Sequence, residues 1–119
     1  MLGAMAVTYA QVLEWVLALP GGEEVMVAEW GHPTLRVAGK MFASGSPDGP
    51  TLSVKASRED QAELIAGEPD TYSVAPYVGR FGWVQVQLST VDPDELRGIL
   101  VEAWRRTAPK KMVKSYDAG

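Results

Sequence analysis

The chain has 119 residues and a mass of 12.9 kDa, which is the size of one ordinary domain and too small for two. Its 46% hydrophobic and 22% charged residues are typical of a globular protein and exclude disordered and collagen-like chains. The formal charge of −4 argues against a protein whose main task is to coat nucleic acid. We therefore expect one domain over residues 1–119, with an ordered core from about 8 to 108.

The chain contains no cysteine. Disulfides, thiolate catalysis, iron–sulfur clusters and the common structural zinc sites all need thiols and are therefore excluded, which fits a reducing cytoplasm. Residues 1–19 carry no early Lys or Arg, and no apolar run is long enough to cross a bilayer. We expect a cytoplasmic protein with no signal peptide, no membrane partner and no cofactor.

The first predicted element is a helix over residues 8–19, with Thr8 as its capping residue and Pro20 at its end. Four segments rich in β-forming residues follow at short intervals, at 24–30, 34–37, 40–43 and 51–55. The dipeptide Ala38-Gly39 is short enough for a tight hairpin, and the polar stretch 44–50 is expected to form a loop. This order predicts an antiparallel meander.

Ser57 begins a second helix, which is short and acidic. Two further strands are predicted at 71–75 and 83–88, joined by the segment 76–82. Asp92 followed by a proline predicts the start of a long helix that runs to about Thr107, after which the chain is expected to fray. The order α-β-β-β-β-α-β-β-α predicts a two-layer α+β domain with helices packed on an antiparallel sheet.

His32 is the single histidine, so it is the only candidate for the base of a Ser-His-acid set. It lies in the turn-like sequence 30–34, where a histidine commonly packs on an aromatic ring or bonds to the backbone. The chain has no nucleophile elbow, zinc-binding helix, phosphate loop or convincing pair of carboxylates. We therefore predict a protein that is not an enzyme and has no metal site.

Aromatic and basic residues interleave along the chain, in a combination that stacks on bases and neutralises phosphates. The segment 77–82 is the best contact candidate, because its two glycines permit an exposed bend. Residues 96–119 hold six basic and two acidic side chains, a pattern that also suits the last turn of a helix. Trp15 and Trp104 are expected in the core. The candidate binding residues are Trp30, His32, Arg36, Lys40, Tyr77, Arg80, Trp83, Arg105, Lys110 and Lys111.

Three separated segments carry a family pattern: WGHPTLRVAGKMFA at 30–43, YVGRFGWV at 77–84, and a C-terminal helix and tail from Glu95 to Lys111. In this order they resemble the MmcQ/YjbR family of small bacterial proteins, over about residues 8 to 112. The resemblance implies a compact fold grouped with secretion-chaperone-like and CyaY-like domains. Members are often labelled DNA-binding, and the resemblance carries over no catalytic residue.

Three functions follow as hypotheses. The leading one is a non-enzymatic, monomeric binding protein that contacts nucleic acid through its basic and aromatic residues. The second is a protein-interaction module, in which the sheet or the loops around Trp30 and Tyr77 receive a peptide or protein partner. The third is a small-molecule binder, in which the aromatic residues line a pocket.

Overall fold

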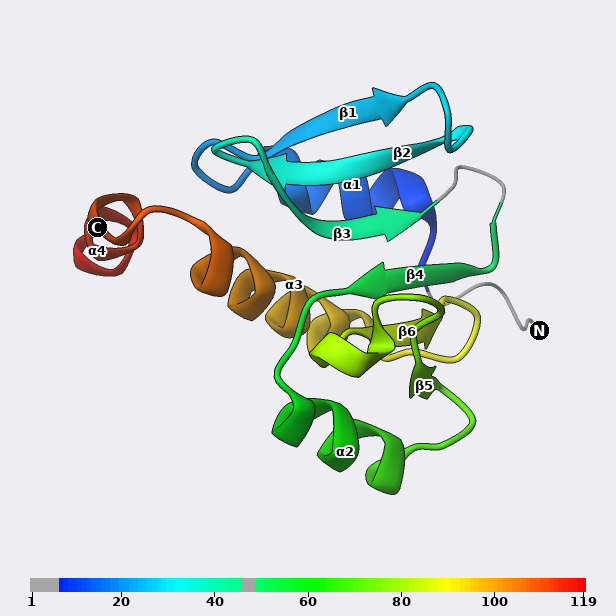
Figure 1. Cartoon of the computed structure of the whole chain (residues 1–119). Coiled ribbons are helices and arrows are strands. Elements are labelled where there is room, and N and C mark those ends of the chain that lie inside the picture. Colours follow the sequence, from blue (N-terminus) through cyan, green and yellow to red (C-terminus); the bar gives the residue numbers. More distant parts are fainter. Residues whose placement is uncertain (1–6, 46–48) are drawn as a thin grey trace.

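The computed structural model of the chain describes residues 7–45 and 49–119. Four α-helices, one 3₁₀ turn (η1) and six strands follow one another in the described residues (Figure 1). Their bounds are α1 Tyr9–Leu17, β1 Glu23–Val27, β2 His32–Val37, β3 Lys40–Gly45, β4 Thr51–Val54, α2 Arg58–Gly67, β5 Tyr72–Val74, η1 Gly79–Phe81, β6 Val84–Gln87, α3 Pro93–Thr107 and α4 Lys110–Ala118.

All six strands form one antiparallel sheet in the order β1-β2-β3-β4-β6-β5. The first four strands are the predicted meander. After α2 the chain reaches β5 at the edge of the sheet and returns as β6, which pairs with β4 on one side and β5 on the other. The predicted α+β class is therefore confirmed. Of the predicted loop at 44–50, residues 46–48 lie outside the described residues.

One face of the sheet forms the core with α1 and α3, which lie behind the sheet in Figure 1. Strand residues such as Leu35, Leu52 and Val86 are fully buried there, beneath apolar residues of the two helices. Trp104 of α3 is fully buried, as expected, and its indole N–H donates to the carbonyl of Pro20, 2.9 Å away. Trp15 is half-buried against the same core.

The local predictions for helix starts and for the tight turn between β2 and β3 are confirmed. Each predicted capping residue accepts a hydrogen bond from the backbone N–H three residues later, at 3.2 Å for Thr8, 3.0 Å for Ser57 and 3.0 Å for Asp92. Ala38 and Gly39 have φ values of 52° and 77°, the two positive values that a tight β-hairpin turn requires.

The end of the chain corrects the prediction of a frayed tail, because Lys110–Ala118 forms helix α4. The ring of Tyr116 packs against Trp104 with centroids 5.0 Å apart, and the Arg105 guanidinium lies 2.6 Å from Asp117. Met112 is partly buried against the core. This helix was not predicted, although the apolar residues of the basic segment recur at helical spacing.

Candidate functional site

The face of the sheet opposite α1 and α3 carries polar side chains. Along β4 and β6 the residues alternate between buried apolar and half-buried polar positions, so Ser53 and Gln85 point away from the core. Ser53 is the register partner of Gln85 on one side and of Ser44 on the other. Three neighbouring strands thus place two hydroxyls and a carboxamide in a row, which forms a polar floor.

Two loops supply aromatic side chains above this floor. Trp30 lies in the turn between β1 and β2 and is 52% exposed. The segment 76–83, which lies in front of the sheet in Figure 1, carries Tyr77 and Trp83. Tyr77 is 97% exposed and has a left-handed φ of 65°, whereas Trp83 is only 7% exposed. A non-glycine residue in this backbone region is strained, and such strain is typical of functional sites.

The floor and the two loops enclose a hollow of about 580 Å³, which we call the sheet-face hollow. Among the described residues that line it, none carries a formal charge at neutral pH. This volume lies in the usual range of small-molecule sites, and the mixture of aromatic walls with a few polar groups is also typical of them. The lining residues are Trp30, His32, Met41, Ser44, Thr51, Ser53, Pro76, Tyr77, Val78, Trp83 and Gln85.

His32 is the first residue of β2 and does not lie in a turn. One of its ring nitrogens contacts two neighbouring oxygen atoms. Its Nδ1 lies 3.1 Å from the Ser44 hydroxyl and 3.2 Å from the carbonyl of Pro33. The ring centroids of His32 and Trp30 are 6.0 Å apart. Both expected roles, packing on an aromatic ring and contact with the backbone, are therefore present. Ser44 and His32 resemble a nucleophile and its base, but the described lining residues include no carboxylate to orient the imidazole.

Hydrogen bonds from the start of α2 fix the position of the loop that carries Tyr77. The side-chain amide of Gln61 donates to the carbonyls of Gly79 and Trp83, at 2.9 and 2.6 Å. Gly82 has a φ of 102°, and a Cβ at this position would lie 2.7 Å from the carbonyl oxygen of Ala56. Only glycine fits this close approach without strain, so the loop has a defined position beside the sheet-face hollow.

The predicted basic residues lie elsewhere, although all of them are in the described part of the chain. Arg36 is on β2, where its guanidinium donates to Thr34 Oγ1 at 2.9 Å and to the carbonyl of Gly39 at 3.2 Å. Lys40 is exposed beside the same hairpin. The guanidinium of Arg80 lies 4.8 Å from the ring centroid of Phe81. None of these three residues lines the hollow.

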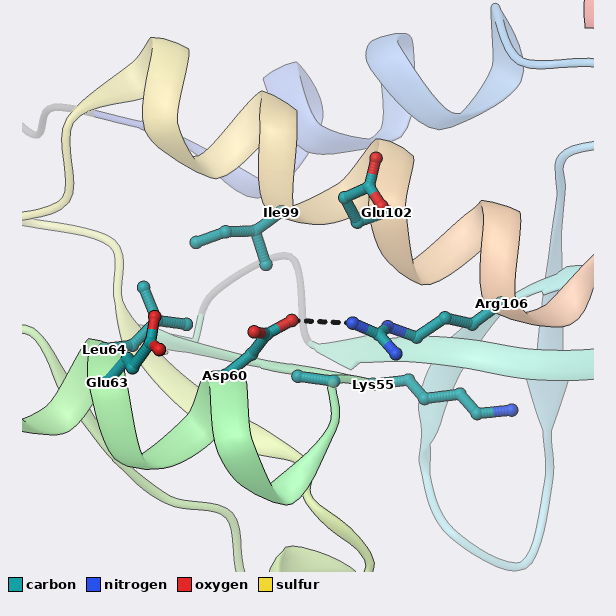
Figure 2. A pocket seen from close by; sticks show the side chains of 8 residues that line it. Lys55, Asp60, Glu63, Leu64, Ile99, Glu102 and Arg106 are labelled. Carbon is teal, nitrogen blue, oxygen red and sulfur yellow. Dashed lines mark hydrogen bonds and ion pairs between the residues drawn. The ribbon is translucent and has the colours of Figure 1, made fainter. Parts of the chain in front are cut away.

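Two arginines of the basic C-terminal end are paired with acids. Arg105 lies 3.2 Å from Glu102 as well as 2.6 Å from Asp117. Arg106 of α3 reaches across to Asp60 of α2, 2.6 Å away, beside a small cleft of about 280 Å³ (Figure 2). Lys110 and Lys111 are exposed on α4. Opposite charges therefore offset part of the predicted positive patch.

The structure thus brings four of the ten candidates together, namely Trp30, His32, Tyr77 and Trp83. The polar floor, of which Ser53 and Gln85 are the central pair, was not predicted from the sequence. Alternation in the two strands was visible in the sequence, but the pairing of β4 with β6 was not, because β5 separates them along the chain.

Within residues 7–45 and 49–119, no group of three or more histidine or acidic side chains could hold a metal ion. The same residues include no helix with the length and apolar character needed to cross a membrane.

Comparisons with known proteins found a similar solved structure, curated relatives and a matching family model. The crystal structure of Deinococcus radiodurans protein DR2400, with the domain DUF419, superimposes with a TM-score of 0.75 at 22% identity, covering 87% of this chain and 80% of that one. The uncharacterized proteins Rv2570 of Mycobacterium tuberculosis and Mb2600 of Mycobacterium bovis are each 33% identical over 76 residues. That match covers 63% of this chain and 59% of each relative. The YjbR family model matches residues 17–106, so the chain belongs to the YjbR family.

Proposed function

We propose that this protein binds a small organic molecule in the sheet-face hollow and releases it unchanged. The observation that carries the proposal is the convergence of Trp30, Tyr77 and Trp83 over a polar floor. Aromatic walls supply contact area, and a few fixed polar groups set the orientation of a ligand, which is the usual composition of a small-molecule site. Tyr77 and Trp30 leave large ring surfaces exposed that a ligand would cover.

The groups that face the hollow support binding without chemistry. A serine becomes a strong nucleophile when its base is held by a third group, usually a carboxylate. The Nδ1 of His32 instead lies near the Pro33 carbonyl and the Ser44 hydroxyl. The described lining residues offer no carboxyl group for general acid–base catalysis.

The test is a thermal-shift and fluorescence titration with indole, flavone, acridone, 1-naphthoate and proflavine, which includes charged and uncharged rings. We expect at least one compound to raise the Tm of the natural protein and to lose most of its affinity in Tyr77→Ser. This variant should fold normally, because the Tyr77 side chain is 97% exposed. Phe81→Ser is the matched control, since Phe81 is exposed in the same loop but does not line the hollow.

Two outcomes would contradict the proposal. If none of the five compounds binds, or if the bound compounds bind Tyr77→Ser equally well, the hollow is not a small-molecule site. If the protein hydrolyses 4-nitrophenyl acetate and Ser44→Ala abolishes this activity, the protein is an enzyme and Ser44 is its nucleophile.

Nucleic-acid binding is the second candidate, and the exposed lysines of α4 are the observation in its favour. Lys110, Lys111 and Lys114 all lie on the exposed surface of this helix. Nucleic-acid binding is less well supported than small-molecule binding, because the candidate basic residues do not line the sheet-face hollow with the aromatic ones.

The aromatic loops could also receive a peptide or a second copy of the chain, and light scattering would then show a complex larger than a monomer.

A further inference from the structure

We infer that the ligand of the sheet-face hollow is an uncharged, flat heteroaromatic molecule with a hydrogen-bond donor and an acceptor side by side on one edge. This inference rests on the proposed function and specifies the chemistry of its ligand. Three independent features of the hollow carry it: the charge of its lining, the ring faces of its walls, and the free polar groups of its floor.

The absence of charge among the described lining residues selects an uncharged ligand. A charged group that leaves water needs an opposite charge or several hydrogen bonds in the protein to replace its hydration. The chain has 26 charged side chains, and the two arginines nearest the C-terminal end of α3 are each paired with acids outside the hollow. A carboxylate, phosphate or ammonium group inside the hollow would therefore lose hydration without a charged partner.

The aromatic walls select a flat ligand. Trp30 and Tyr77 come from two different loops and keep 52% and 97% of their side chains exposed. Trp83 is nearly buried and also lines the hollow. Because every aromatic ring has a face that stacks, such residues hold planar molecules with little dependence on the identity of the ring.

The polar floor determines which hydrogen-bonding groups the edge of the ligand carries. Gln85 carries a carboxamide, which presents one donor and one acceptor side by side, and Ser53 adds a hydroxyl from the neighbouring strand. Among the described residues, neither side chain makes a hydrogen bond within the protein, whereas Ser44 already contacts His32. A carboxamide pairs best with a ligand edge that has the complementary donor and acceptor, as glutamine does with adenine.

The first experiment compares related flat ligands of different charge. Acridone-4-carboxamide and acridone-4-carboxylate have the same ring and nearly the same shape, and proflavine is a cationic relative. We expect the carboxamide to bind at least tenfold more tightly than the carboxylate or proflavine, measured by the change in acridone or proflavine fluorescence. The net charge of −4 would by itself favour the cation, so a preference for the neutral compound reports on the hollow and not on the overall field.

The second experiment tests the floor. Acridone lacks the carboxamide, and its own N–H and carbonyl lie on opposite edges. We therefore expect Gln85→Leu to weaken acridone-4-carboxamide about tenfold, the loss of one or two hydrogen bonds, and to leave acridone unchanged. Gln87→Leu is the matched control, because Gln87 is a half-buried polar residue of the same strand but does not line the hollow.

The two proposals fail in different ways. If the carboxylate or proflavine binds as tightly as the carboxamide, and this binding is lost in Tyr77→Ser, the inference about ligand class is wrong while the small-molecule site stands. If Gln85→Leu weakens acridone and its carboxamide equally, the role of Gln85 is overturned. If no compound binds the natural protein, the small-molecule site is overturned together with its ligand class.

Discussion

The Glu68 carboxyl lies beside the carboxyl of Glu95. The hydroxyl of the buried Tyr72 donates to the same Glu95 carboxylate. The hydrogen bond with Glu95, and then the negative charge of Glu95, raise the pKa of Glu68 above its ordinary 4.5. The desolvated Tyr72 also has a raised pKa, with burial as the main cause.

The raised pKa of Glu68 predicts a stability that falls as the pH rises. The folded chain binds this proton more tightly than the unfolded chain, so the stabilisation is present below 4.5 and is lost as the pH rises through the folded pKa. Glu68→Gln, which stays uncharged, should have a higher Tm than the natural protein near pH 7 and about the same Tm near pH 4. The measurement is thermal unfolding by circular dichroism between these values.

A matched control for this variant is Glu63→Gln, which removes one charge from the exposed surface of α2, the helix that ends just before Glu68. We expect this change to alter the pH dependence of the Tm much less. If the two variants behave alike, net charge and not the contact with Glu95 determines the effect. If Glu68→Gln lowers the Tm near pH 7, then the contact stabilises the ionised form and the sign of our argument is wrong.

At the scale of elements, α2 acts as a brace for the loop that carries Tyr77. All of α2 lies in the described part of the chain, and none of its residues is fully buried, although Leu64 and Ile65 pack partly buried against the core. Polar contacts link the helix to the loop and to α3: Gln61 bonds to Gly79 and Trp83, Arg58 donates to the carbonyl of Arg80 at 2.9 Å, and Asp60 pairs with Arg106 (Figure 2). The position of the aromatic wall therefore depends on a few hydrogen bonds.

We predict that Gln61→Glu loosens this wall. A carboxylate cannot donate to the two carbonyls that the Gln61 amide satisfies, so the cost to stability should be about 1–3 kcal/mol. Affinity for the acridone probes should fall, and the amides of residues 79–83 should exchange hydrogen faster while those of β2 and β3 keep their protection. Gln11→Glu, on the exposed face of α1, is the matched control. Unchanged probe affinity and unchanged exchange in Gln61→Glu would show that α2 does not position the loop.

At the scale of the whole molecule, local patterns in the sequence predicted the elements but not their long-range neighbours. Thr8, Ser57 and Asp92 cap helices because the signal lies within four residues. The neighbours Ser53 and Gln85 meet only because β6 enters the sheet between β4 and β5. Pairing between strands that are distant in sequence leaves no local trace, and so the polar floor could not be predicted.

Because long-range neighbours leave no local signal in the sequence, the candidate residues could not be divided in advance into those that meet at the hollow and those that lie elsewhere. Interleaved aromatic and basic residues in the sequence suggested one shared surface, whereas the structure places Trp30 and Tyr77 at the hollow and leaves Arg36 and Lys110 outside it. Residue types were therefore a poor guide to which of the candidate side chains meet. The helix α4 was missed for a related reason, since the contact of Tyr116 with Trp104 crosses from one helix to another.

The distribution of charge over the whole molecule leads to the last prediction, which separates the two candidate functions. An uncharged ligand in an uncharged hollow releases no counterions, so the affinity for acridone should stay nearly constant between about 50 and 500 mM salt. Nucleic acid bound through α4 would instead lose about 0.9 decades of affinity per decade of salt for each phosphate neutralised. The double variant Lys110→Glu/Lys111→Glu should leave acridone binding unchanged, because neither lysine lines the hollow. A duplex oligonucleotide that binds with a steep salt dependence, lost in this double variant, would establish the lysines of α4 as a phosphate-binding surface and favour the nucleic-acid function. A flat titration with the oligonucleotide and a flat affinity for acridone would leave the sheet-face hollow as the site where this protein works.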